Sequence, residues 1–134
     1  MIVNPSREAP PPQQFQKQTS SQWEEVPILK KTIDLYKTYY VYAQLFPKKD
    51  KYTLGATCER YLIAVIELLL EASYSSKENK RTRLFLANSK FETLKVFIRL
   101  LRELGVIDQK KYIVLQAMIQ DIGKMFGGWM KSLS

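Results

Sequence analysis

Apolar residues recur at steps of three and four along most of the chain, starting just after Pro27. This spacing places them on one face of an α-helix, which turns once every 3.6 residues. Four segments show the pattern, at about 28–46, 53–73, 77–104 and 108–131. No segment alternates apolar and polar residues with the period of two that is typical of strands. The pattern therefore predicts an all-α protein.

Local signals mark where the four helices begin and end. Pro27 suits a first helical turn and Pro47 terminates the first helix, because proline has a fixed φ and no backbone N–H. Thr53 and Asp108 are residue types that cap the free amides of a helix start, and Gly105 is the type that follows a helix end. Since short connections make consecutive helices antiparallel, we expect an up-down-up-down four-helix bundle.

The first two helices carry more apolar residues than one core needs. The first has two rows, which are Leu29, Ile33, Tyr36, Tyr40 and Ala43, and Leu35, Tyr39, Tyr42 and Phe46. The second is apolar nearly all round at 61–70. The third and fourth have single rows, which are Leu84, Ala87, Phe91, Leu94, Ile98 and Leu101, and Leu115, Ile119, Ile122, Phe126, Trp129 and Leu133. Because a helix in a monomeric bundle has one stripe, the surplus indicates a subunit interface.

Residues 1–26 lack apolar periodicity and are rich in proline and glutamine. This composition predicts a disordered leader before a bundle at 27–134, since it cannot offset the entropy of ordering. A proline-rich ligand for a partner domain is the alternative. Trp23 is an exception within the leader, because it lies close enough to the first helix to pack against it.

The chain has 21 Lys and Arg against 13 Asp and Glu, for a net charge of +8. The leader holds two basic and three acidic residues, so residues 27–134 hold 19 basic and 10 acidic residues, or +9. A basic folded body indicates a polyanionic partner, with nucleic acid first and an anionic membrane or acidic protein second. Charge that only maintains solubility is the other interpretation.

Clusters of cations are the candidate nucleic-acid contacts. They are Lys77, Lys80, Arg81 and Arg83 at the start of the third helix, Lys95, Arg99 and Arg102 along it, Lys48, Lys49 and Lys51 after the first helix, and Lys110 and Lys111 at the fourth. Cations at a helix start oppose its macrodipole, which an arriving phosphate would offset. Tyr52 and Tyr112, each next to a lysine, are candidates for stacking on a base. A solvated helix face is the alternative interpretation of these clusters.

Catalytic and metal chemistry has few candidate residues. The chain has no histidine, the commonest general base and metal ligand, and a single cysteine, Cys58, which excludes an internal disulfide and fits a reducing cytoplasm. Glu67 and Glu71 share a helix face but lack a Glu-x-x-His partner, so we expect them to meet a basic group on a neighbouring helix or subunit. No signal peptide or membrane span is indicated. We therefore expect a cytoplasmic protein without enzymatic activity, cofactor, metal or membrane contact.

Three glycines interrupt the last helix, at Gly123, Gly127 and Gly128. Each costs about 1 kcal/mol relative to alanine in a helix interior. Gly123 and Gly127 lie four apart, so we expect them to let another backbone approach, with Trp129 filling the space beside that contact. The motif is interpreted as a helix-packing device and not as a phosphate loop.

Three segments resemble the accessory variability determinant proteins of diversity-generating retroelements. They are 84–88 (LFLAN), 94–101 (LKVFIRLL) and 122–132 (IGKMFGGWMKS). These proteins belong to a wider group of small four-helix bundles that includes proteins encoded by intervening sequences of 23S ribosomal RNA genes. The likeness covers about residues 28–133 and leaves the leader outside.

This resemblance implies a barrel-like homopentamer whose basic surface binds RNA or DNA and the retroelement's reverse transcriptase. It implies no catalysis by this chain itself, which would support the polymerase during error-prone cDNA synthesis from a template RNA in mutagenic retrohoming. A ring-forming adaptor related to the intervening-sequence proteins, with only nonspecific nucleic-acid binding, is the alternative function.

Overall fold

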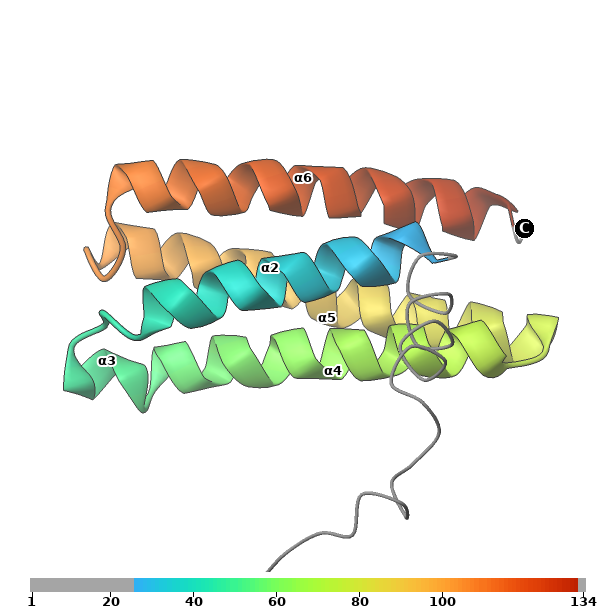
Figure 1. Ribbon diagram of the computed structural model, residues 1–134. Coiled ribbons are helices and arrows are strands. Elements are labelled where there is room, and N and C mark those ends of the chain that lie inside the picture. Colours follow the sequence, from blue (N-terminus) through green and yellow to red (C-terminus); the bar gives the residue numbers. More distant parts are fainter. Residues whose placement is uncertain (1–25, 133–134) are drawn as a thin grey trace, which may run out of the picture.

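Helices account for almost all of residues 26–132, which are the part of the chain that the computed structural model describes (Figure 1). The elements are α2 (Pro27–Ala43), α3 (Lys48–Lys51), α4 (Leu54–Tyr74), α5 (Lys77–Glu103) and α6 (Gln109–Ser132). Residues 26–132 contain no strand, which confirms the predicted all-α class. The predicted leader, apart from Val26, and the row member Leu133 lie outside the described residues.

The four long helices form a bundle in which chain neighbours are also neighbours in space. α2 packs on α4, α4 on α5 and α5 on α6, and α6 closes the bundle against α2. Figure 1 shows the four axes lying side by side, with α3 at the turn between α2 and α4. This is the four-helix bundle that the short connections predict.

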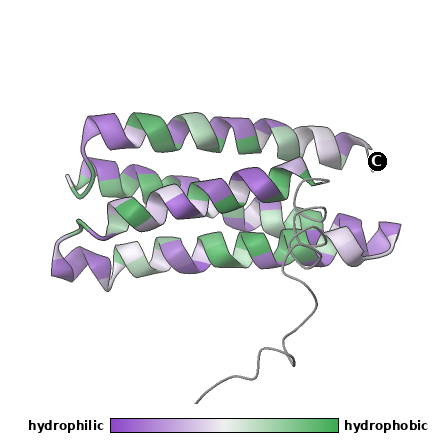
Figure 2. Ribbon diagram, viewed as in Figure 1, coloured by the Kyte–Doolittle hydropathy of each residue, from purple (hydrophilic) through white to green (hydrophobic). Residues whose placement is uncertain are grey.

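Each of the four long helices contributes buried side chains to a shared core. The buried side chains include Leu29, Leu35 and Tyr39 of α2, Cys58, Leu62, Val65 and Leu69 of α4, Leu84, Phe91, Leu94, Ile98 and Leu101 of α5, and Leu115, Ile119, Ile122 and Phe126 of α6. Both predicted rows of α2 contribute to it. Figure 2 shows the long apolar stretch in the middle of α4, where Ile63 still has 42% of its surface exposed. The bundle therefore leaves part of the surplus apolar surface uncovered.

α2 ends at Ala43, earlier than the predicted 46. The amides of Leu45 and Phe46 bond to carbonyls three residues back, at 3.0 and 3.1 Å, so the chain tightens out of α-helix there. Pro47 explains the early end, because it disfavours helical geometry in the residue before it. Phe46 nevertheless joins the core, with its ring edge-on to Tyr39 at 5.8 Å between ring centres.

The connection after α2 holds a short helix that the sequence pattern did not predict. Pro47 occupies the N-cap position of α3, and its carbonyl accepts the amides of Asp50 and Lys51 at 2.9 Å. The predicted capping role of Thr53 is wrong: its hydroxyl donates to the Lys49 carbonyl at 2.8 Å, and makes no cap hydrogen bond to α4. The Thr53 hydroxyl therefore bonds to the backbone of α3 and is not available to cap α4.

The turn between α5 and α6 confirms both of its predicted signals. Gly105 has φ of 76° and donates to the Arg102 carbonyl, while Val106 donates to the Leu101 carbonyl at 2.8 Å. This pair of bonds is a Schellman motif, which favours glycine at the left-handed position. Asp108 then caps α6 by accepting the Lys111 amide at 2.8 Å.

Candidate nucleic-acid interface

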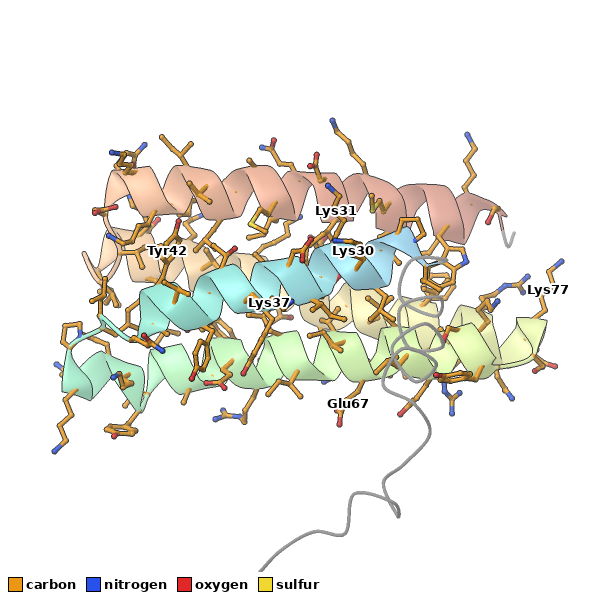
Figure 3. The ribbon with its side chains drawn as sticks, in the orientation of Figure 1. Lys30, Lys31, Lys37, Tyr42, Glu67 and Lys77 are labelled. Carbon is orange, nitrogen blue, oxygen red and sulfur yellow. The ribbon has the colours of Figure 1, made fainter. Side chains whose placement is uncertain are left out.

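The antiparallel fold gathers two of the predicted cation groups at one end of the bundle. α3, which carries Lys48, Lys49 and Lys51, lies at the same end as the start of α6, which carries Lys110 and Lys111 (Figure 1). The start of α5 lies at the opposite end, where Figure 3 shows Lys77 projecting from the bundle. Two groups that are distant in the chain therefore become one basic end.

At this basic end, Lys111 is held by its neighbours. Its Nζ lies 3.2 Å from Asp108 Oδ2 and 5.8 Å from the ring centre of Tyr42. Hydrogen bonds from the Lys111 backbone and side chain hold the pKa of Asp108 below its usual value. Lysines 48, 49, 51 and 110 make no ion pair within the described residues, so their charges are available for an anion.

The two predicted stacking tyrosines differ in exposure. Tyr52 is 70% exposed beside the α3 lysines, where an unstacked base could lie on it. Tyr112 is half-buried and its hydroxyl is hydrogen-bonded to the Gln116 amide. Tyr52 is therefore the better of the two candidates.

Two of the cations at the start of α5 contact different neighbouring helices. The group consists of Lys77, Lys80, Arg81 and Arg83. The Arg83 side chain pairs with Glu71 of α4 at 3.1 Å, which confirms the basic partner expected for that carboxylate. The Lys80 ammonium lies 5.9 Å from the ring centre of Trp129 on α6. Lys77 and Arg81 are exposed.

Glu67, the other member of the predicted carboxylate pair, points away from the bundle (Figure 3). It makes no ion pair with any residue in 26–132, so the expected basic partner is not found within the described chain.

Among residues 26–132 no group of three or more Asp, Glu, Cys or His side chains could hold a metal ion.

Lys95, Arg99 and Arg102 lie on the side of α5 that faces α6. Lys95 Nζ is 3.0 Å from Glu92, an exposed intrahelical pair worth only a few tenths of a kcal/mol. Arg102 donates to the amide oxygen of Gln109 on α6 and so keeps its full charge. Arg99 is exposed and makes no ion pair within the described chain. Three cations therefore follow one edge of α5, and among them only Lys95 is paired with a carboxylate of the described residues.

A groove of about 520 Å³ separates this edge from α6. We call it the α5–α6 groove, and its lining residues are Glu92 and Lys95 of α5 and Gln116, Ile119, Gln120, Gly123 and Lys124 of α6. Gln116, Gln120 and Lys124 were not among the predicted site residues. Their spacing of four was a usable signal, since it places them on one helix face. The groove offers cations for phosphates and amide groups for bases or sugars.

The glycines of α6 do not act as predicted within the chain. A Cβ placed on Gly123, Gly127 or Gly128 would meet no described atom within 4 Å, so no backbone within residues 26–132 approaches them closely. Gly123 instead leaves the α5–α6 groove open at its position. Trp129 is half-buried and packs on the core, beside Lys80.

Cys58 and Tyr39 lie inside the bundle and not at the basic surface. Tyr39 donates its hydroxyl to the Gly55 carbonyl at 2.7 Å, and burial raises its pKa. Burial also raises the pKa of the Cys58 thiol to about 12, so the thiol is protonated at neutral pH and is a poor nucleophile. Cys58 is thus a core residue.

The nearer surface of α2 carries three lysines that the sequence analysis did not select. Figure 3 labels Lys30, Lys31 and Lys37. Lys30 pairs with Asp34 at 3.4 Å, whereas Lys31 and Lys37 make no ion pair within residues 26–132. These lysines were not predicted as site residues, because they are scattered along a mostly apolar helix and form no cluster of cations in the sequence. Positive charge is therefore spread more widely than the selected residues.

Comparison with known proteins gives a family match for this chain. No curated protein matches the chain. None of the described helices is long and apolar enough to cross a membrane. A family model described as bAvd-like matches residues 26–133, which include the whole bundle. The chain therefore belongs to the bAvd-like family, the accessory variability determinant proteins of diversity-generating retroelements.

Proposed function

We propose that this protein is a non-catalytic accessory subunit that binds the reverse transcriptase of a diversity-generating retroelement together with its template RNA. Family membership supports the association with a reverse transcriptase. The cationic edge of α5 and the α5–α6 groove are the main structural support for RNA binding. In this role the chain holds the polymerase and the RNA during mutagenic cDNA synthesis.

The chemistry of the groove suits a single-stranded nucleic acid. Arg99 and Lys124 are exposed cations without a carboxylate partner in the described chain, so a phosphate need not displace one. Guanidinium and ammonium groups bind phosphate oxygens with charge-assisted hydrogen bonds. Gln116 and Gln120 present donors and acceptors between the cations, where they can reach base edges or the 2′-hydroxyl that distinguishes RNA from DNA.

Two charge reversals and one matched control test RNA binding. We expect Arg99→Glu and Lys124→Glu to weaken binding of the template RNA, because each removes a cation that binds phosphate. The slope of log affinity against log salt should fall by about 0.7 for each phosphate of a single strand that is no longer neutralised. Lys37→Glu makes the same charge change on α2, outside the groove, and should leave affinity nearly unchanged. Titration of labelled RNA at several salt concentrations measures all four proteins.

A flat salt response, or equal losses of affinity in all three variants, would contradict the assignment to the groove. The alternative is a structural adaptor that binds an acidic protein face and meets nucleic acid only nonspecifically. The pairing of Arg83, Lys95 and Lys111 with carboxylates favours it, since paired cations have less charge to offer. The same titration with and without the polymerase separates the two: RNA retained at physiological salt only through the polymerase supports the adaptor.

A ring of five copies, the number implied by the family resemblance, is part of this proposal. The outer face of α5 carries apolar side chains opposite the core, with Leu86 50%, Val96 52% and Leu100 36% exposed. A different apolar face spans α2 and α4, where Tyr40 and Ile63 are exposed. Two unlike apolar faces on one chain suit a heterologous contact, which closes into a ring when its rotation permits.

The proposal assigns no catalytic group to this chain and locates it in the cytoplasm. Cys58, its single thiol, is buried and protonated, which fits a reducing compartment and a structural role. Template RNA or its DNA copy and the polymerase are the proposed partners. The proposed function involves no membrane and no cofactor.

A further inference from the structure

A cavity of about 440 Å³ opens at the end of the bundle where α2 and α5 begin and where α4 and α6 end. Its walls come from all four long helices and include Val26, Ile28, Ser73, Lys80, Met125 and Trp129. Most of these side chains are apolar and half-buried. A cavity of about 150 Å³ already holds a benzene molecule, so this one has room for an indole ring.

Electrostatics at the cavity favour an acidic occupant. Lys80 is the charged residue among the described side chains that line it, and its ammonium faces the Trp129 ring without a carboxylate partner in residues 26–132. The first turn of α2 has no acidic residue and no side-chain cap. The start of α2 is the positive end of its helix dipole, which attracts carboxylates.

The end of α6 has low intrinsic helix propensity, because it contains two adjacent glycines. Gly127 and Gly128 face open space, yet α6 continues to Ser132. Helices with low intrinsic propensity depend on tertiary contacts to persist. Trp129 and Met125 supply part of that packing, but both border the cavity. An occupant of the cavity would complete it.

We propose that Trp23 of the same chain fills this cavity and that Glu24 and Glu25 face Lys80 and the start of α2. We call this contact the Trp23 latch. Trp23 precedes Val26, a wall residue, by three positions, and three residues span at most about 10 Å. The two glutamates lie between them, so an aromatic ring and two negative charges arrive together at an apolar cavity with one cation. Trp23 itself lies outside the described residues.

The latch is independent of nucleic-acid binding and is tested on the full chain alone. The protein has two tryptophans, Trp23 and Trp129, so 5-fluorotryptophan labelling gives two ¹⁹F resonances, which Trp23→Phe assigns. We expect the Trp23 resonance to lie away from its position in urea and to be protected from acrylamide. Lys80→Glu should move it toward the urea position and expose it. Lys110→Glu, the same change at the other end of the bundle, should leave it unchanged.

A charge swap makes the test specific to the proposed latch. Glu25→Lys combined with Lys80→Glu should restore much of the shift and protection that Lys80→Glu removes. The Trp129 resonance and the thermal unfolding transition report whether each variant is folded, and Ser73→Arg, which obstructs the cavity, is a second blocking variant should Lys80→Glu unfold the chain.

Three results would overturn the latch. A Trp23 resonance at its urea position in the unmodified chain means that the cavity is left for another ligand. A shifted resonance that ignores both Lys80→Glu and Ser73→Arg means that Trp23 packs elsewhere. Protection that disappears on dilution, as copies separate, means that the tryptophan in the cavity comes from a second copy.

Discussion

Gly55 and Gly127 are both helical glycines, but their surroundings are opposite. A Cβ on Gly55 would lie 2.8 Å from the Asp50 carbonyl oxygen and 3.0 Å from the Phe46 ring, closer than real Cβ contacts. A Cβ on Gly127 would meet nothing within 4 Å. Gly55 therefore allows the α3 backbone and Phe46 to pack on α4, whereas Gly127 has no such role among the described residues.

Alanine at these two positions should change stability in opposite directions. Gly55→Ala should lower the free energy of unfolding by about 1–3 kcal/mol, because the carbonyl it would meet is backbone and cannot move aside cheaply. Gly127→Ala should raise it by up to about 1 kcal/mol through helix propensity alone. Urea unfolding of the two variants measures both values. Equal effects would contradict this assignment, and a loss of stability at Gly127 would show that another chain packs there.

Capping residues and helix-ending glycines can be recognised by type in the sequence, but their neighbours in space cannot. Thr53 and Asp108 are both capping residues by type, and only Asp108 caps, because the Thr53 hydroxyl bonds to the Lys49 carbonyl of a helix too short to predict. Gly105 was predictable, since a left-handed residue after a helix depends on local backbone alone. Residue roles set by distant neighbours required the fold.

At the scale of elements, the start of α6 depends on a charged cap. Asp108 accepts the Lys111 amide and its ammonium, and these bonds lower the pKa of the carboxyl. A group whose pKa is lower in the folded state stabilises the fold above its unfolded pKa. That contribution is lost as the pH falls through the folded value. The α6 cap should therefore weaken only in acid, below the ordinary pKa of an aspartate.

Asp108→Asn tests this dependence, because asparagine still caps a helix but carries no charge. We expect its melting temperature to lie below that of the parent protein at neutral pH and to converge with it in strong acid. Asp121→Asn, an exposed carboxylate in the middle of α6, controls for the loss of one negative charge. Thermal unfolding by circular dichroism at a series of pH values gives the comparison. A difference that persists unchanged into acid would contradict a role for the ionised cap.

The long helices were predictable because each carries a row of apolar residues over many turns. The α5 row is buried in the core, and so is the α6 row from Leu115 to Phe126. The short helix α3 was not, since four residues give no periodicity. The α5–α6 groove was missed for a related reason. Gln116 and Lys124 are unremarkable until α6 is known to lie beside the cationic edge of α5.

For the whole molecule, topology decides which charges act together. The lysines of α3 and those at the start of α6 meet at one end only because α2 and α6 are antiparallel neighbours. The net charge predicted a polyanionic partner. It could not show that the lysines of α3 and α6 lie at one end, or that the outer face of α5 is apolar. Assembly would multiply both features, since every copy in a ring repeats the same groove.

The proposed ring therefore predicts that separating the copies weakens RNA binding even when no charge is removed. Val96→Asn with Leu100→Asn makes the outer face of α5 polar and should reduce the mass in solution to that of one chain, because both side chains are exposed within a single copy. An RNA that crosses several grooves has fewer of its phosphates bound when the ring opens, so the salt slope should fall as well as the affinity.

Ile113→Asn, at an exposed apolar residue of α6, is the matched control and should preserve both mass and slope. Light scattering gives the mass, and RNA titrations over a range of salt give the slope. A mass that is unchanged by the α5 substitutions would remove that face from the interface. A full salt slope in the separated chains would instead mean that one groove binds RNA alone, because the number of released counterions follows the number of phosphates neutralised and not the number of copies present.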